Sequence, residues 1–253
     1  MHKFKIVIPS YNNEDWVEYN LASILNQTYT NYEVLYLNDA SKDSTLDKVQ
    51  SIVGSLHNWT IISNPVNKRR GFNIDPHNVH IQKFMDNGED ILVFVDGDDW
   101  LYDDEVLYKL NQFYAKYTPW MTYGGMVCYP SALPGNPQNT PYSDQVHQHK
   151  QYRQDYWRAS HLRTFKWELY KQIKQEDLLY SKTKEHYFHA EDLATSFPCL
   201  EMCPPSKIGI LDFYSYVFNE TPANRSRGIE REQEAGYELE QEIRSRTKYA
   251  QLV

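Results

Sequence analysis

Two spacings of hydrophobic positions alternate along the first hundred residues. Short apolar and aromatic runs, the pattern of strands buried on both faces, occur at 4–10, 32–39, 59–63 and 90–96. Between them, apolar residues recur every three or four positions, as on helices with one buried face, at 16–25, 46–53, 75–87 and from 103 onward. Parallel strands need a crossover connection, so this alternation predicts an α/β fold: a Rossmann-like, mostly parallel central sheet flanked by helices. We expect Asn12 or Asn13 to cap the first helix.

The second half of the chain is less regular. It predicts a strand at 120–129, a Pro- and Gly-rich loop at 131–142, a helical segment at 161–173 and a late strand at 207–218. The tail from Gly228 is charged at nearly every second position, which is typical of a solvated helix. Such a helix is also a candidate contact for a homodimer.

Composition excludes several classes of protein. The 253 residues carry a formal net charge of −8, which argues against a nucleic-acid binder with a basic surface. No run of about eighteen apolar residues predicts a transmembrane segment, and no signal peptide opens the chain, so we expect a cytoplasmic protein. Three cysteines form too sparse a set for a disulfide framework.

The most unusual feature is a group of acids directly after a buried-looking strand. Asp96, Asp98 and Asp99 follow ILVFV, at the end of the strand where open α/β sheets place their ligands. Three carboxylates so close together repel one another unless a cation joins them. A divalent metal that carries a phosphate-bearing ligand would remove this cost. The alternative is a polar turn that contains a helix cap.

Four segments taken in order carry a family resemblance. IVIPSYNNE, LYLNDASKDST, VDGDD and HAEDLA resemble the motifs of the inverting family 2 glycosyltransferases, which have the GT-A fold of nucleotide-diphospho-sugar transferases. The likeness is clear over residues 4–104 and looser to 218. It implies one domain over 1–253, with a nucleotide-sugar-binding half (1–104), a smaller acceptor-side half (105–227) and the charged C-terminal helix (228–253).

The resemblance implies a donor site in the first half. Pro9, Tyr11 and Asn12 match the loop that holds the nucleotide, where the Tyr11 ring can stack on uracil, and Glu14 closes that loop. Asp39 matches the acid that accepts a hydrogen bond from the ring N–H of the base. From its position alone, Asp39 could instead cap the helix that follows it.

The acidic motif and a later acid pair supply the implied chemistry. Asp98 matches the main ligand of Mn²⁺ or Mg²⁺, Asp96 faces ribose or metal, and Gly97 between them belongs to the same donor site. Asp192 matches the general base, and we expect its neighbour Glu191 to point elsewhere. By itself, Asp192 would be taken for a helix cap.

Several basic residues have more than one reading in this scheme. Arg70 lies where relatives contact phosphate, but the surrounding order NPVNKRRGFN departs from the family pattern, so a surface position is the alternative. Other candidates are His186 and His189 for the metal shell, Arg225 and Arg227 for a lid over phosphate, and Arg158, His161 and Arg163 for the acceptor or diphosphate side.

Together these features predict a metal-dependent inverting glycosyltransferase. It would move one sugar from a nucleotide-diphospho-sugar, favoured to be a UDP-sugar, to a hydroxyl of a glycan or glycoconjugate. The Gln-x-x-Arg-Trp signature of processive synthases is missing, which favours single transfers. The alternative is a catalytically degenerate module that binds a nucleotide or sugar without turnover.

Overall fold

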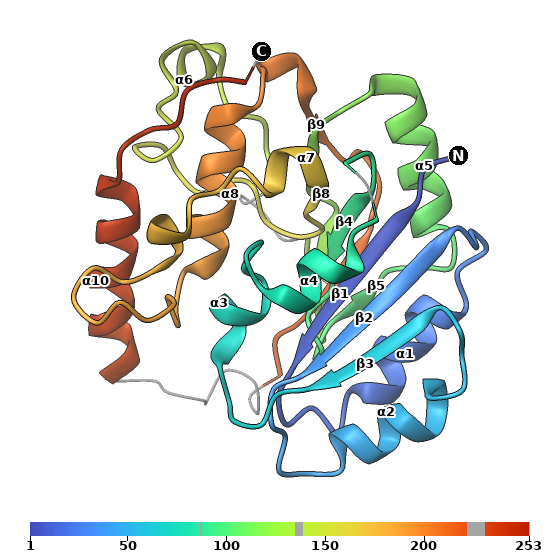
Figure 1. The fold of residues 1–253 in the computed structure, drawn as a ribbon. Helices are drawn as coiled ribbons and strands as arrows, with labels where there is room; N and C mark the ends of the chain where they lie inside the picture. Colours follow the sequence, from blue (N-terminus) through green and yellow to red (C-terminus); the bar gives the residue numbers. More distant parts are fainter. Residues whose placement is uncertain (87, 135–138, 222–230, 253) are drawn as a thin grey trace.

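The computed structural model describes residues 1–86, 88–134, 139–221 and 231–252. Its centre is a seven-stranded sheet in the order β3-β2-β1-β4-β8-β6-β9 (Figure 1). The strands are β1 (Phe4–Ser10), β2 (Tyr32–Asn38), β3 (Trp59–Ser63), β4 (Ile91–Phe94), β6 (Met121–Tyr123), β8 (Thr164–Lys166) and β9 (Ile208–Ile210). All neighbours pair in parallel except β8, which is antiparallel to β4 and β6. The predicted mostly parallel α/β sheet is confirmed.

Helices cover both faces of this sheet, as the alternation along its strands requires. In β1, Phe4, Ile6 and Ile8 belong to one core cluster and Val7 to the other, because successive side chains point to opposite faces. The first cluster packs against α1 (Val17–Leu25), α2 (Thr45–Val53) and α5 (Val106–Tyr117). The second includes residues of α4 (Val79–Phe84), α7 (Trp167–Tyr170), α8 (Glu191–Met202) and α10 (Arg231–Ser245).

Two of the predicted strands are each divided between two sheets. Residues 120–129 form β6 and then β7 (Met126–Tyr129), and residues 207–218 form β9 and then β10 (Tyr216–Asn219). Gly124 and Gly125 have φ values of +110° and +80°, a left-handed backbone that turns the chain out of the first sheet. A Cβ on Gly125 would lie 2.2 Å from the Phe213 carbonyl oxygen. The two segments therefore leave the main sheet together, and β10 pairs with β7 and with β5 (Trp100–Leu101) in a three-stranded sheet.

Other local predictions were wrong in their details. The first helix begins after Trp16, whose side chain makes no capping hydrogen bond, and the Asn13 carbonyl oxygen accepts the backbone N–H groups of Trp16 and Val17. The helix expected at 75–87 is present but shorter, as α4 capped by Asn78, and a further short helix, α3 (Arg69–Asn73), precedes it. The segment 161–173 forms β8 before the short α7, because the chain completes the sheet beside β4. The remaining short helices are α6 (Asp144–His149) and the 3₁₀ turns η1 (Gln175–Leu178) and η2 (Pro205–Lys207).

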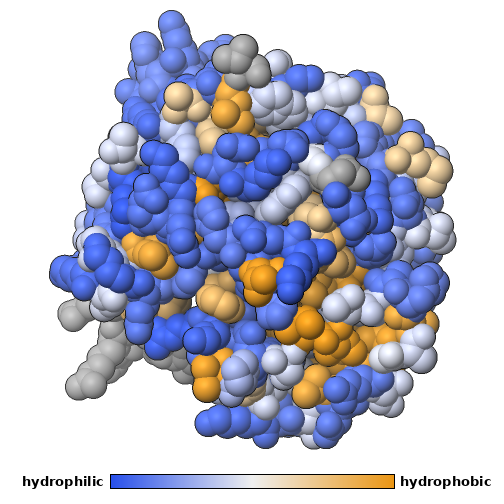
Figure 2. Space-filling model, viewed as in Figure 1, coloured by the Kyte–Doolittle hydropathy of each residue, from blue (hydrophilic) through white to orange (hydrophobic). Residues whose placement is uncertain are grey.

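The C-terminal helix α10 is not solvated on all sides. Leu239 and Ile243 are 2% and 1% exposed, and they join the core cluster that contains α8. The prediction of a solvated helix is thus wrong for this face, and a dimer contact through the helix stays a prediction. The surface in Figure 2 is mostly hydrophilic, with a hydrophobic area at the lower right, near the β3 edge of the sheet. Among the described helices none is long and apolar enough to cross a bilayer.

Candidate active site

The acidic turn after β4 is held rigidly by its neighbours. Asn20 of α1 donates its side-chain amide to the carbonyl oxygens of Asp96 (3.0 Å) and Asp99 (2.7 Å). Asn219 of β10 donates its backbone N–H to Asp99 Oδ1 at 2.8 Å and its amide to the Asp98 carbonyl at 3.1 Å. Tyr216 donates its hydroxyl to Asp99 Oδ2 at 2.7 Å. Two elements distant in sequence, α1 and β10, therefore hold the acidic turn in place.

Gly97 brings this turn against the loop that follows β1. A Cβ on Gly97 would lie 2.5 Å from both Cβ and Oγ of Ser10 and 2.8 Å from the Asn13 amide nitrogen. A larger residue would push the two loops apart. Gly97 thus shapes the site by close approach and is not among the residues that line the cleft.

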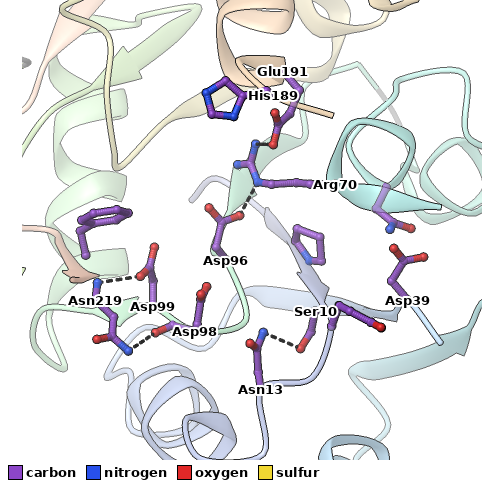
Figure 3. A pocket seen from close by; sticks show the side chains of 14 residues that line it. Ser10, Asn13, Asp39, Arg70, Asp96, Asp98, Asp99, His189, Glu191 and Asn219 are labelled. Carbon is purple, nitrogen blue, oxygen red and sulfur yellow. Dashed lines mark hydrogen bonds and ion pairs between the residues drawn. The ribbon is translucent and has the colours of Figure 1, made fainter. Parts of the chain in front are cut away.

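A cleft of about 540 Å³ opens over the carboxyl ends of β1, β2 and β4. In Figure 3, Asp39 and Asp99 lie at opposite ends of it, with Asp96 and Asp98 between them and Arg70 and Glu191 on its far wall. Its lining comprises Pro9, Ser10, Tyr11, Asn13, Asp39, Arg70, Asn73, Asp96, Asp98, Asp99, His189, Glu191, Phe218 and Asn219. The structure thus brings together the predicted Pro9, Tyr11, Asp39, Arg70, Asp96 and Asp98.

Asn12 and Glu14 lie behind the cleft lining and connect two loops. Asn12 Oδ1 accepts the backbone N–H of Lys42 at 2.8 Å, and Glu14 Oε2 accepts that of Ser44 at 2.9 Å. The left-handed backbone of Asn12 (φ 52°) suits a residue at such a turn. Both side chains therefore join the loop after β1 to the loop after β2.

Asp39 is buried at one end of the cleft and is not a helix cap. Its Oδ1 accepts N–H groups from the Asn64 side chain (2.7 Å) and the Lys68 backbone (2.8 Å), and its Oδ2 accepts from the Arg69 backbone (2.7 Å). These bonds hold the loop before α3. Because two carboxylate oxygens offer about four acceptor sites, Asp39 can still accept one further hydrogen bond.

Arg70 joins the two acidic motifs, and its side chain, 23% exposed, lines both clefts. Its Nε contacts Asp96 Oδ1 at 2.8 Å and its Nη1 contacts Glu191 Oε1 at 3.4 Å. Burial disfavours the ionised form of Asp96, but the charge of Arg70 holds the pKa of this acid below its usual value. Burial raises the pKa of Glu191, and Arg70 only partly opposes that shift.

The acid pair at the start of α8 lies where the first cleft meets a second one of about 410 Å³. Asp192 lines only the second cleft, where its Oδ2 accepts from Arg163 Nη1 at 3.0 Å. The two acids point to different partners, because Glu191 contacts Arg70 and Asp192 contacts Arg163. Glu191 nevertheless lines both clefts, so it belongs to the site, which the sequence did not lead us to expect.

The three candidate histidines lie in different surroundings. His186 Nε2 contacts Asp75 Oδ2 at 2.7 Å, and His186 lines neither cleft. His189 lines both clefts. His161 lines the second cleft, and one of its ring nitrogens lies within 4.8 Å of a carboxylate oxygen of Asp96 and of Asp99. Burial, together with Arg163, lowers the pKa of His161 well below its usual value.

Asp99 is the least exposed member of the acidic turn, at 1%. Burial, followed by the charges of Asp98 and Asp96, raises the pKa of Asp99 well above its usual value. Its ionised form therefore needs a compensating positive charge. The cluster of Asp96, Asp99 and His161 provides oxygen and nitrogen donors that fit a divalent cation.

The sequence did not indicate several residues that complete the site. Asn219 and Phe218 come from β10, whose position beside β5 follows from the break at 211–215. Glu240 of α10 lines the second cleft, although the tail showed no chemical pattern. Of the second-half basic candidates, Arg163 pairs with Asp192, whereas Arg158 bonds Asp155 and Thr140. Arg225 and Arg227 lie outside the described residues.

Comparison with known proteins agrees with this geometry. A family model described as Glycosyl transferase family 2 matches residues 5–174. A poly(ribitol-phosphate) beta-glucosyltransferase of Bacillus spizizenii is 37% identical over 111 residues, which cover 43% of this chain and 17% of that protein. The glycosyltransferase GlyA of Streptococcus pneumoniae is 30% identical over 109 residues, or 42% of this chain and 15% of that protein. The chain thus spans well under half the length of these curated relatives.

Solved structures share the fold over nearly the whole chain. Staphylococcus aureus TarS 1-349 in complex with UDP-GlcNAc has a TM-score of 0.63 and 18% identity over 95% of this chain and 65% of that one. A mannosyltransferase from Pyrobaculum calidifontis, in complex with GDP-Man and Mn²⁺, has a TM-score of 0.56 and 16% identity over 89% of this chain and 58% of that one. At these identities the similarity shows the fold alone, and the expected GT-A architecture is confirmed.

Proposed function

The chain belongs to glycosyl transferase family 2, and we propose that it moves one sugar from a UDP-sugar to a hydroxyl of a glycan or glycoconjugate. The observation that carries this proposal is the convergence of two clefts at Arg70, Asp96 and Glu191. One cleft has the shape and polarity for a nucleoside diphosphate. The second cleft would bind the acceptor beside these same three residues.

The two ends of the first cleft have different proposed roles. At one end, Tyr11 and Asp39 offer a ring to stack on a base and an acceptor for the base's N–H. At the other end, Asp96 and Asp98 would hold Mn²⁺ or Mg²⁺ beside the diphosphate. A bound cation would act as a Lewis acid that stabilises the charge on the departing diphosphate.

The second cleft places a carboxylate on the acceptor side. Asp192 has 25% of its side chain exposed, and Arg163, only 3% exposed, holds one of its oxygens. A fixed, ionised carboxylate can take the proton of the acceptor hydroxyl as it attacks the sugar. Attack in one step from the side opposite the leaving diphosphate would invert the anomeric configuration.

Turnover separates this proposal from that of a binding module without catalysis. The protein should release UDP from at least one of UDP-glucose, UDP-galactose or UDP-GlcNAc, faster when a glycan acceptor is added. Binding of UDP without release of UDP from any of these donors would favour the catalytically degenerate alternative.

Metal should strengthen nucleotide binding through the acidic turn. Because the turn concentrates three carboxylates, we expect UDP to bind at least about tenfold more tightly with Mn²⁺ than with a chelator. Asp98→Asn should remove most of this difference. Calorimetric titration of UDP with and without metal checks the prediction, and Asp103→Asn, a change of an acid outside the cleft lining, is the control. Equal UDP affinity in both conditions would count against the metal assignment.

The donor cleft should prefer uracil or thymine to cytosine. Asp39 can accept the ring N–H of uracil, whereas N3 of cytosine is an acceptor and would face the carboxylate. One unpaired buried group costs about 1–3 kcal/mol, so CDP should bind more weakly than UDP or dTDP by that amount. Titration of the unaltered protein is the cleaner measurement, because Asp39→Asn would also disturb the loop that Asp39 holds. CDP binding as tight as that of UDP would refute the role of Asp39.

A further inference from the structure

His161 is buried beside the acidic turn, and one of its ring nitrogens makes no hydrogen bond to any described residue. The residue is 9% exposed, and its Nδ1 has no hydrogen-bond partner among the described residues. Its ring stacks on Tyr216 with centroids 4.6 Å apart and 15° between the planes. A buried nitrogen without a partner is costly, and native proteins rarely keep one unless a ligand or a water completes it.

The imidazole and two carboxylates converge on one point. One donor atom from each of Asp96, Asp99 and His161 lies within 4.8 Å of the others. Ligands of a single ion are separated by up to about twice a metal–ligand bond of about 2.0–2.3 Å, so a small adjustment suffices for a shared ion. The donors come from the turn after β4 and from the segment before β8, so the sheet itself brings them together.

Tyr216 contacts all three of these residues. Its hydroxyl donates to Asp99 Oδ2 at 2.7 Å and accepts the Asp96 backbone N–H at 3.1 Å. Its ring lies under the His161 ring. Hydrogen bonds and packing of this kind around ligands orient them and strengthen metal binding. The three ligand residues are therefore already oriented in the absence of an ion.

We propose that His161 binds a divalent cation through a ring nitrogen, together with carboxylate oxygens of Asp96 and Asp99, and that this chain consequently prefers Mn²⁺ to Mg²⁺. Mg²⁺ is bound almost entirely through oxygen ligands and waters, whereas Mn²⁺, a first-row transition ion, also accepts an imidazole nitrogen. The inference deepens the proposed function, because the ion would lie beside the donor cleft. It adds Asp99 and the His161 nitrogen as ligands of the ion that the proposed function places on Asp96 and Asp98.

The test is pulsed electron paramagnetic resonance of Mn²⁺ bound to the full chain, with and without UDP. The unaltered protein should show modulation from a coordinated imidazole ¹⁴N, and protein labelled with ¹⁵N only in histidine should show the ¹⁵N pattern instead. This measurement needs no variant, so it remains decisive if a change at the buried His161 prevents folding. Bound Mn²⁺ without nitrogen coupling, or no Mn²⁺ binding in either condition, would overturn the inference.

A matched pair of variants identifies the histidine. His161→Gln should remove the nitrogen signal, weaken Mn²⁺ binding at least about tenfold and weaken Mg²⁺ binding less. His189→Gln, a change of another imidazole that lines both clefts, should keep the nitrogen signal. If His189→Gln removed the signal and a folded His161→Gln kept it, the assignment to His161 would be wrong.

Failure of this inference is distinguishable from failure of the proposed function. UDP release from a UDP-sugar is measured on the same samples. Turnover together with Mn²⁺ that lacks nitrogen coupling would refute the His161 ligand and leave the transferase proposal standing. Nitrogen coupling in a protein that turns over none of the UDP-sugars would support the metal site and refute the UDP-sugar transferase proposal.

Discussion

Asp192→Asn should lower the rate of sugar transfer about 10²–10⁴-fold while UDP affinity changes little. The reason is that Asp192 lines the second cleft and not the first, so its loss should affect the acceptor proton and not nucleotide binding. The side-chain amide cannot take that proton. Single-turnover transfer, donor hydrolysis and calorimetric UDP binding together check this expectation.

Glu191→Gln is the matched control for the proposed general base, Asp192. Glu191 contacts Arg70 and lines the donor cleft, so its change should affect donor affinity more than the transfer step. Asp192→Asn also removes the charge that pairs with the buried Arg163. The thermal midpoint of this variant must therefore be compared with that of the unaltered protein. Near-normal transfer by Asp192→Asn, or a defect that weaker UDP binding fully explains, would contradict the assignment.

Arg153→Met should lower the free energy of unfolding by about 3–5 kcal/mol. Arg153 and Glu201 have side chains that are 2% and 0% exposed, and their bidentate contact has distances of 2.7 and 3.0 Å. Arg153 also donates to the Ile243 carbonyl oxygen of α10 at 2.6 Å. Removal of the guanidinium leaves a buried carboxylate without its counter-charge. Equilibrium urea unfolding measures the loss.

Two further variants show whether burial is the cause. Arg153→Met combined with Glu201→Leu should recover much of the lost stability, because two apolar side chains leave no buried charge. Lys171→Met breaks an exposed pair with Glu168 and should cost no more than about 1 kcal/mol. A loss for Arg153→Met as small as that for Lys171→Met would show that the buried pair adds little to stability.

The missed residues of the site share a physical cause. Asn219, Phe218 and Glu240 follow the acidic motif by well over a hundred positions, and no local pattern connects them to it. Asn219 reaches Asp99 only because β10 leaves the main sheet and pairs with β5. β7, the other partner of β10, leaves the main sheet at Gly124 and Gly125, where the backbone is left-handed.

Local sequence patterns were enough to predict the first half of the fold and the residue types of the candidate donor site. Strands β1 to β4 and helices α1 and α2 were predictable because hydrophobic periodicity is a local property that burial acts on directly. Asp96, Asp98 and Asp39 could be placed together because the carboxyl ends of parallel strands meet at one edge of the sheet. Their proposed roles in metal binding and base recognition rest on the chemistry of carboxylates and on a family resemblance.

The hydrogen-bond and ion-pair partners of these residues could be identified only from the tertiary structure. Arg70 contacts Asp96 and Glu191, residues 26 and 121 positions away, because α3 packs against the segment before α8. A Cβ on Gly71 would lie 2.3 Å from the Tyr187 carbonyl oxygen, which shows how closely these segments approach. His161 joins the acidic turn because β8 lies beside β4 in the sheet. Contacts of such long separation depend on how the whole chain packs, and no spacing within one segment encodes them.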